Sequence, residues 1–344
     1  MESYKNILII RMSSLGDIIH TLPTLYAIRN NWPQARIVWA VHKQFRDILP
    51  GKPYIDEVVY IDERQFINPL YWWNLHKQLR AYDFDLSLDL QGWAKSGGVA
   101  LCSGAKRRVG FWELQEGSAA ISTPLIGKYQ HGNLIERYLD TVRVLGGKVN
   151  TVAFPLPDFA KEKKTMTYRL QKDGLHKPYV VIVPGSRWEL KEWPVLYWRQ
   201  FIQRLISQQV SVVLLGSKGD KKKGDVLLEG IQHPFIKNYM GKTTIKEMMA
   251  VIQQGALFIS ADTGPLHIAN ALKRPLIALF GTTCAERSAP YYGTDNAHIH
   301  IIVSPTSRAT VWHPKIKDAQ CMAQITVDQV WHMYKQCCME NGIA

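Results

Sequence analysis

The sequence lacks the segments that would place it within a membrane. No stretch of about 18 consecutive apolar residues occurs, so we expect no membrane-spanning helix. The first residues, MESYKN, lack a basic segment followed by a long apolar one, so we expect no signal peptide. Both absences favour a cytoplasmic protein.

Cysteine is scarce, and its pattern predicts neither disulfides nor a metal centre. The five Cys are odd in number and match no disulfide framework or zinc spacing. Reduced thiols are typical of the cytoplasm. The stretch HIHII (298–302) places two His on one face of a strand, but no third ligand follows nearby. We therefore expect no bound metal.

Several catalytic signatures are also missing. No G-x-G-x-x-G follows the first strand-like run, no Tyr-x-x-x-Lys lies in a suitable helix, and no G-x-S-x-G elbow occurs. GKTT (241–244) resembles the end of a P-loop, but Ile236 stands where the first Gly is required. These absences disfavour a nucleotide-sugar epimerase or dehydrogenase, an α/β-hydrolase and a P-loop NTPase.

Acidic residues are outnumbered: 42 Lys and Arg face 29 Asp and Glu, giving a formal charge of +13. Such a charge favours anionic partners, which include nucleotides, phosphorylated sugars, nucleic acid and an anionic membrane face. One alternative is therefore a basic nucleic-acid or anionic-lipid binding protein, with cations spread along an exposed face. The aromatic stretch NPLYWWNLHKQLRAY (68–82) is either a lipid-touching surface or a helix that packs its Trp residues inward.

Apolar runs alternate with helical patterns along the chain, which predicts an α/β fold of doubly wound units. The runs are continuous in Val, Ile and Leu, as in parallel strands buried on both faces. The expected strands are 6–10, 36–41, 57–61, 86–90, 179–183, 210–216, 256–260 and 276–281.

The rhythm of strands and helices breaks at 155–178, where two Pro open a charged stretch that Pro178 ends. We expect a helix inside this boundary and two Rossmann-like domains, at 1–165 and 175–322. Residues 323–344 form a final helix that begins after Thr326. In such sheets ligands bind at the carboxyl ends of the strands, so the cleft between the halves is the expected site.

The second half carries loops suited to a diphosphate. Asp262, Thr263 and Gly264 follow a buried strand and lead into a helix, whose N-terminus favours anions. Another loop, PGSRWELKEWP (184–194), places two cations directly after a strand, where they can neutralise a diphosphate. A third loop (214–225) carries Asp220, an acid able to hold ribose hydroxyls.

In the first half, SSLGDIIHTLP (13–23) follows the first strand. A phosphate site would disfavour the negative charge of Asp17 there, so the acid needs another explanation. Two are open: a helix N-cap, or a group in the reaction.

Four stretches together resemble glycosyltransferase family 9, the ADP-heptose:lipopolysaccharide heptosyltransferases: RMSSLGDIIHTLP, DLQGWAKSG, PGSRWELKEWP and DTGPLHIANAL…LFGTT. DLQGWAKSG looks more like heptosyltransferase I than II. The resemblance implies the GT-B architecture, in which an acceptor-binding domain and a nucleotide-sugar-binding domain face each other across a cleft. It also implies that the C-terminal helix returns to the N-terminal domain.

The resemblance implies an inverting, metal-independent transfer of heptose from ADP-heptose to an inner-core lipopolysaccharide acceptor of the Kdo-lipid A type. Asp17 would be the general base. No cofactor is implied, and the partner would be an anionic glycolipid at the cytoplasmic face of the inner membrane, where the enzyme binds peripherally, with no nucleic acid. The donor residues would be Ser186, Arg187, Lys191, Asp220, Asp262, Thr263, Gly264 and His267. The acceptor residues would be Ser14, Gly16, Arg64, Gln91, Lys95, Ser96, Arg107 and Arg108.

The chain departs from the family where GFWELQEGSAA carries Glu116, because heptosyltransferase I tends to have an Arg after this segment. An acid there would repel a carboxylate sugar, so another acceptor stays open. Another donor sugar also stays open, because the diphosphate motifs do not identify the sugar.

Overall fold

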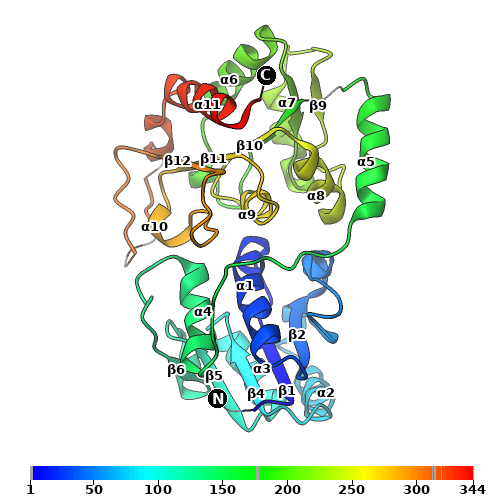
Figure 1. Cartoon of the computed structure of the whole chain (residues 1–344), viewed down its shortest axis with the longest axis vertical. Coiled ribbons are helices and arrows are strands. Elements are labelled where there is room, and N and C mark those ends of the chain that lie inside the picture. Colours follow the sequence, from blue (N-terminus) through cyan, green and yellow to red (C-terminus); the bar gives the residue numbers. More distant parts are fainter. Residues whose placement is uncertain (1–2, 176–177, 312, 314, 319, 344) are drawn as a thin grey trace. The chain divides into compact units, whose positions relative to one another are not determined.

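The computed structural model describes residues 3–175, 178–311, 313, 315–318 and 320–343. The chain divides into two compact units, Met1–Pro157 and Asp158–Ala344. Each unit is built on one six-stranded sheet in which neighbouring strands run parallel (Figure 1). The expected α/β class with two doubly wound sheets is confirmed.

The first unit has the strand order β3-β2-β1-β4-β5-β6. Its strands are β1 (Asn6–Ile10), β2 (Arg36–His42), β3 (Glu57–Ile61), β4 (Leu86–Asp89), β5 (Arg107–Phe111) and β6 (Thr123–Leu125). Its helices are α1 (Leu15–Asn31), α2 (Pro69–Arg80), α3 (Ala94–Ser103) and α4 (Leu134–Val144). On one face Leu8 and Ile10 pack with Leu75 and Leu79 of α2, while α1 and α4 pack together on the other face.

The second unit repeats this plan with the order β12-β11-β10-β7-β8-β9. Its strands are β7 (Tyr179–Val183), β8 (Ser211–Leu214), β9 (Ile236–Asn238), β10 (Leu257–Ala261), β11 (Leu276–Phe280) and β12 (Ile299–Val303). Its helices are α5 (Ala160–Lys172), α6 (Val195–Ser207), α7 (Lys221–Leu227), α8 (Ile245–Gln254), α9 (Gly264–Ala271), α10 (Ala285–Ser288) and α11 (Val327–Asn341).

Both sheets have a switch point at their centre. The first chain half starts in β1, winds outward through β2 and β3, and then returns to pair β4 with β1. The second half does the same with β7 and β10. Loops that leave neighbouring strands in opposite directions open a crevice at the carboxyl ends of those strands. The motifs of the sequence follow these four strands.

The eight strands expected from the sequence are present, with bounds that shift by up to two residues. The sequence reading did not assign β5, β6 and β9. β6 and β9 are three residues each, and β9 is half-buried throughout. Short, partly polar strands at a sheet edge do not produce the continuous apolar run that marks a buried strand.

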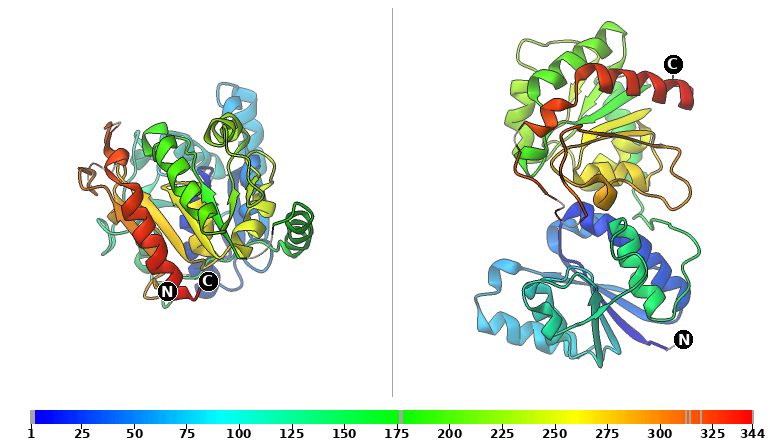
Figure 2. Two further views of the ribbon diagram at one scale, coloured as in Figure 1. Left: turned by 90° about the horizontal axis from the view of Figure 1, so that it is seen from above. Right: turned by 90° about the vertical axis from the view of Figure 1, so that its left-hand side faces the viewer.

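The boundaries differ from the expected ones. The division falls at Pro157 rather than near 165–175, because α5 belongs to the second unit: Met166 is buried there and Thr167 Oγ1 donates to Gln254 Oε1 (2.5 Å). Residues 323–344 were expected to return to the N-terminal domain. In the structure α11 instead packs on α6 and β12 of the second unit (Figure 2).

The reason for this placement of α11 is its apolar face. Val330, Tyr334 and Cys337 are buried in the core of the second unit, where the Tyr334 ring lies 6.0 Å from that of Phe201 in α6. Among the described residues, no helix is both long enough and apolar enough to cross a bilayer.

Candidate functional site

Asp17 lies in the first turn of α1, directly beyond the carboxyl end of β1. Its Oδ2 accepts hydrogen bonds from the backbone N–H (3.1 Å) and the hydroxyl (2.8 Å) of Ser14. Its Oδ1 pairs with the guanidinium of Arg11 at 2.9 Å. Ser14 is the N-cap, and Asp17 is the third helical residue, which reaches back to it as in a capping box. Asp17 thus has a structural role, at the third position after the N-cap rather than as the N-cap itself.

The surroundings keep Asp17 ionised. Burial alone would raise the pKa of Asp17, but the charge of Arg11, then that of His20, and the Ser14 hydrogen bonds outweigh it. They hold the pKa well below its usual range. The Asp17 side chain is still 36% exposed, whereas that of Arg11 is 7% exposed. A carboxylate open to ligand is thus backed by a buried cation, with Gly16 buried beside it.

The loop after β4 is tied to the loop after β1. The side-chain oxygen of Gln91 accepts from the backbone N–H groups of Met12 (2.9 Å) and Ser13 (3.3 Å). Asp89, fully buried at the end of β4, accepts from Gln91 N, Gly92 N and Ser96 Oγ at 2.8–2.9 Å. Gln91 and Ser96 therefore shape the loops around Asp17, and both are themselves buried.

The cations expected for the acceptor differ in placement. Lys95, at the start of α3, pairs with Glu63 (3.0 Å), which also meets His42 Nε2 (3.0 Å). Arg64 pairs with Asp62 at 2.9 Å, and its side chain is 87% exposed. Both lie at the carboxyl edge of the first sheet. Exposed ion pairs are weak, so an anionic ligand can compete for these cations.

Arg107 and Arg108 are not brought to this edge. They open β5, so they lie at the amino end of the parallel sheet, where Arg107 pairs in register with Leu86, the first residue of β4. Arg107 donates to the Tyr4 hydroxyl (2.9 Å), and Arg108 to the carbonyl of Ile121 (3.3 Å). We withdraw both from the candidate acceptor site.

Glu116 turns toward the N-terminus of α3. Its Oε2 accepts from the backbone N–H of Ala94 at 3.2 Å. The N-terminus of α3 would favour an acceptor anion, but the carboxylate of Glu116 already occupies this position. This contact gives a structural reason for the acid that the sequence raised as a departure.

In the second unit, three predicted donor residues form one cluster at the switch point. Lys191 follows β7 and its Nζ lies 2.7 Å from Oδ2 of Asp262, which follows β10. His267 Nε2 lies 3.5 Å from Oδ1 of Asp262. Burial alone would raise the pKa of Asp262, but Lys191 and then His267 outweigh it, so the pKa is held far below its usual range.

The remaining donor candidates surround this cluster. Thr263 is the N-cap of α9 and Gly264 its first residue, so the N-terminus of this helix, with its positive dipole end, lies next to Asp262. Ser186 donates its backbone N–H to Glu192 (2.7 Å), so this group is already used within the protein. Arg187 is exposed on the same loop.

Asp220 lies at the end of the loop after β8. Its Oδ2 accepts from the backbone N–H (2.8 Å) and hydroxyl (2.6 Å) of Ser217. Its Oδ1 faces Gly185 so closely that a Cβ at this glycine would lie 2.5 Å from the oxygen. Gly185 is therefore required for the approach of the β7 and β8 loops, which brings Asp220 beside the Ser186 loop.

Sequence reasoning missed Arg11, Asp89 and Glu192. Arg11 directly follows the apolar run 6–10, and Asp89 lies inside the motif DLQGWAKSG at the end of another apolar run. A charged residue at the end of an apolar strand is the sequence signal that could have indicated both. Glu192 accepts from Lys223 Nζ (2.5 Å) across 31 residues, and nothing local indicates this pair.

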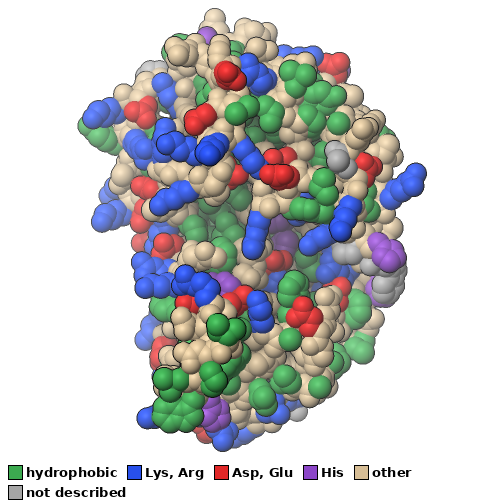
Figure 3. All heavy atoms as spheres, turned by 180° about the vertical axis from the view of Figure 1, so that it is seen from behind, with side chains coloured by type: hydrophobic (Ala, Val, Ile, Leu, Met, Phe, Trp, Pro, Cys, Tyr) green, Lys and Arg blue, Asp and Glu red, His purple; other side chains and the backbone are tan. Residues whose placement is uncertain are grey.

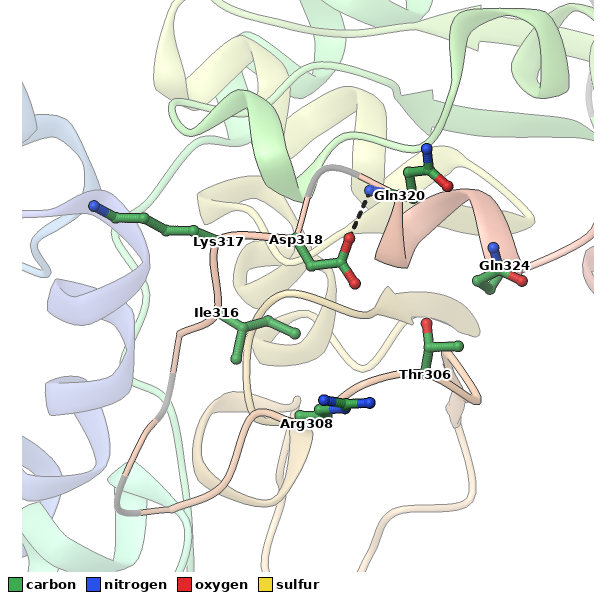
Figure 4. Close-up of a pocket in the computed structure, with 7 residues that line it drawn as sticks. All are labelled: Thr306, Arg308, Ile316, Lys317, Asp318, Gln320 and Gln324. Carbon is green, nitrogen blue, oxygen red and sulfur yellow. Dashed lines mark hydrogen bonds between the residues drawn. The ribbon is translucent and has the colours of Figure 1, made fainter.

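A cavity of about 550 Å³ lies elsewhere in the second unit, and seven residues line it (Figure 4). They belong to the segment between β12 and α11, which adjoins the end of β11 through Ile316 N and Thr282 O (2.9 Å). None of the predicted donor residues lines it. Within the described ranges no group of three His, Cys, Asp or Glu side chains could hold a metal ion.

The chain thus combines two doubly wound sheets with an ionised carboxylate at one switch point and a Lys–Asp–His cluster at the other. The chain belongs to glycosyltransferase family 9 (heptosyltransferase), which residues 72–311 match.

Curated relatives and solved structures agree with this family. The chain is 27% identical over 305 residues to lipopolysaccharide heptosyltransferase 1 of Pseudomonas aeruginosa, covering 85% of this chain and 83% of the relative. Its fold resembles ADP-heptose lps heptosyltransferase II of Escherichia coli (TM-score 0.78, 22% identity, 98% and 99% coverage). It also resembles E. coli heptosyltransferase WaaC solved with ADP (TM-score 0.74, 22% identity, 96% and 99% coverage). These structures share the GT-B fold class expected from the sequence.

Proposed function

We propose that this protein transfers heptose from ADP-heptose to an inner-core lipopolysaccharide acceptor of the Kdo-lipid A type, with inversion at the anomeric carbon. The observation that carries the proposal is Asp17, an ionised and partly exposed carboxylate at the switch point of the first sheet. The relatives named as lipopolysaccharide heptosyltransferases and the neighbour solved with ADP support the choice of donor and acceptor.

In this mechanism Asp17 is the general base. The acceptor hydroxyl attacks the anomeric carbon on the face opposite to the leaving ADP, and Asp17 takes the hydroxyl proton. A carboxylate offers about four acceptor sites. Arg11 and Ser14 contact three of them, which leaves room for the acceptor hydroxyl on Oδ1.

The depressed pKa makes Asp17 a weak base, and this determines at which stage of C–O bond formation the proton is transferred. A free hydroxyl would not give its proton to so weak a base. As the new C–O bond forms, however, the attacking oxygen becomes positively charged and strongly acidic. Proton transfer late in the bond-forming step therefore suits Asp17, whose ionisation is guaranteed at neutral pH.

The donor lies at the second sheet. An ammonium carries three N–H donors, so Lys191 can contact the diphosphate while it keeps Asp262. Arg187 and the N-terminus of α9 add positive charge where the leaving ADP develops negative charge. Asp262 and His267 contact the heptose hydroxyls, and Asp220 holds the ribose through Oδ1.

The acceptor side uses Ser14, Gly16, Gln91, Lys95 and Ser96, with Arg64 at the rim. The enzyme works at the cytoplasmic face of the inner membrane as a peripheral protein. Its reaction needs no metal and no cofactor, since protein cations stabilise the leaving group, and it binds no nucleic acid.

The test is transfer itself. Purified protein is incubated with ADP-heptose and a Kdo-lipid A acceptor, with and without EDTA, and the product is identified by mass spectrometry and by its anomeric configuration. Calorimetry with ADP, GDP and UDP measures nucleotide choice separately. A heptosylated product with inverted configuration and unaffected by EDTA is expected. If product forms only with another sugar nucleotide, the donor assignment is wrong. If product forms only with another acceptor, the acceptor assignment is wrong.

A further inference from the structure

The outer face of α2 and the loop before it expose apolar side chains that no core requires. Ile67 is 93% exposed, and Leu70 and Trp73 are each 60% exposed. The inner face of the same helix carries the buried Leu75 and Leu79. The helix therefore has an apolar face toward the core and a second apolar surface at its outer N-terminal half.

The sequence left two alternatives for this segment, a lipid-touching surface or a helix that packs its Trp residues inward. In the structure the two adjacent tryptophans point in opposite directions. Trp72 turns inward: its Nε1 donates to the carbonyl of Phe66 (2.8 Å), and its ring covers Gly98 of α3, where a Cβ would lie 2.8 Å from it. Trp73 turns outward. The packing of α2 on α3 is thus complete without Ile67, Leu70 and Trp73.

The charged side chains within the segment that carries this apolar surface have one sign. Residues 66–80 contain no Asp or Glu. Lys77 and Arg80 continue the line of Leu70 and Trp73 along one side of the helix, at spacings of three and four residues. Lys77 Nζ lies 5.7 Å from the Trp73 ring, and in the described part of the chain no carboxylate pairs with Lys77 or Arg80. Figure 3 shows hydrophobic side chains gathered with Lys, Arg and His at the lower left, the end where α2 lies.

We propose that this surface, formed by Ile67, Leu70, Trp73, Lys77 and Arg80, docks the protein on a lipid bilayer with anionic headgroups. The apolar half enters the boundary between headgroups and acyl chains, where tryptophan is favoured. The cations remain among the headgroups, which attract them. A protein partner would more often be matched by a surface of mixed charge, whereas residues 66–80 contain no acid.

The inference deepens the proposed function and rests on it only for its biological meaning. α3, which packs on α2, begins with Lys95 and Ser96 of the candidate acceptor site. Docking through α2 would therefore hold the acceptor half of the enzyme at the surface from which a glycolipid headgroup projects.

The experiment measures binding without donor or acceptor. The full chain is sedimented with vesicles of phosphatidylethanolamine and phosphatidylglycerol, and with vesicles of phosphatidylcholine alone. The variants are Leu70→Ser/Trp73→Ser and Lys77→Gln/Arg80→Gln. The control is Tyr168→Ser/Leu196→Ser, which removes exposed apolar residues (68% and 60%) from the second unit. Thermal unfolding confirms that each variant is folded, and light scattering gives its oligomeric state.

Wild type and control should bind the anionic vesicles and prefer them to phosphatidylcholine. The apolar variant should lose at least about tenfold in affinity. The charge variant should lose its preference for anionic lipid, as wild type does at high salt. Equal vesicle binding by wild type and the apolar variant would overturn the proposal, as would a change of oligomeric state in that variant, which would assign the surface to a protein interface. Transfer to a soluble, deacylated acceptor should stay unchanged in the variants, so a failure of docking is distinguished from a failure of the proposed chemistry.

Discussion

At the scale of single residues, the candidate site consists of charges that hold one another in place. Arg11 is buried, and it faces the carboxylate of Asp17 while its guanidinium also donates to the carbonyl of Leu90. Lys191 and Asp262 form a similar pair in the second unit. Asp17 is thus stabilised by Arg11, which directly follows β1, and Lys191 by Asp262, which is distant in sequence. The effect of substituting one member of a pair depends on what happens to the other.

Lys191 allows donor binding to be separated from structural support. Lys191→Ala should weaken ADP binding by about 1.5–3 kcal/mol, because a charge-assisted phosphate contact is lost. It should also destabilise the second unit by about 3–5 kcal/mol, because the carboxylate of Asp262 is left buried without its cation. Lys191→Ala/Asp262→Asn should restore most of the stability and none of the affinity.

Calorimetry with ADP and thermal unfolding measure the two effects. Lys273→Ala is the control, since its pair with Asp295 (2.6 Å) is exposed and should contribute little. Unchanged ADP affinity in the single variant would remove Lys191 from the donor site.

Asp89 gives a pH-dependent stability of known sign. Burial raises its pKa to about 6, although its hydrogen bonds from Gly92, Ser96 and Gln91 and the charge of Arg11 oppose this. The folded pKa lies above the value of about 3.9 in an unfolded chain. The folded state therefore binds more protons between these values, and its stability falls by about 3 kcal/mol as the pH rises from about 4 to above 6.

In Asp89→Asn this loss should vanish. Thermal unfolding of both proteins is measured from pH 4 to pH 7. As the pH rises, the free energy of unfolding of the wild type should fall relative to that of the variant. A difference that does not change with pH would contradict the assigned shift.

At the scale of secondary-structure elements, the sequence predicts those whose pattern is set by local burial. Strands such as β1 and β7 are buried on both faces and read as continuous apolar runs. The start of α11 follows from its capping residue Thr326, whose side chain accepts from the backbone N–H of Gln329. Thr263 occupies the N-cap position of α9, but its side chain makes no capping hydrogen bond. The sheet that a helix packs on is decided by distant residues, which is why the placement of α11 could not be predicted.

Tyr334 tests where α11 belongs. Tyr334→Ala should destabilise the second unit by about 3–5 kcal/mol, because a buried aromatic ring that packs against Phe201 is removed from the core. Met339→Ala, at a position 78% exposed on the same helix, is the control and should change stability by less than about 0.5 kcal/mol. Thermal unfolding with and without ADP should show the loss in the ligand-stabilised transition. If Tyr334→Ala instead lowers only the melting temperature of the transition that ADP does not shift, α11 would belong to the first unit.

At the scale of the whole molecule, one plan is used twice. Each unit begins in the middle of its sheet, winds outward, and returns beside its first strand, so each presents two loops at a switch point. The motifs identified in the sequence follow β1, β4, β7 and β10, so a strand-by-strand reading predicts a site at the carboxyl ends of these strands. The ion pairs between these loops, 71 residues apart for Lys191 and Asp262, follow from sheet order and could not be derived from local sequence.

The excess of positive charge is also a property of the whole chain. A formal charge of +13 draws anionic substrates toward the protein irrespective of where they bind. The structure distributes part of this charge to the donor cluster and part to α2, and many of the other cations are paired with acids. Composition therefore predicts that the ligands are anionic, and the fold indicates candidate sites for them.

The central claim is that Asp17 takes the proton of the acceptor, and Asp17→Asn tests it most directly. Asn keeps the size of Asp and removes the proton acceptor, but its carboxamide has one oxygen where Asp17 uses two, toward Ser14 and toward Arg11. Stability should fall by about 1–3 kcal/mol, since the single oxygen of Asn can accept from Ser14 or from Arg11 but not from both, and the negative charge beside Arg11 is lost. ADP affinity should stay within twofold, since the donor residues lie in the second unit.

The measurement is heptose transfer per folded molecule in Asp17→Asn, beside the control Glu247→Gln. Glu247 occupies the same third position of a capping box, at α8, outside the candidate site. Transfer should fall by about 10²–10⁴ in Asp17→Asn and remain near wild type in the control. Near-normal transfer by folded Asp17→Asn would contradict the account and leave Asp17 with a structural role alone.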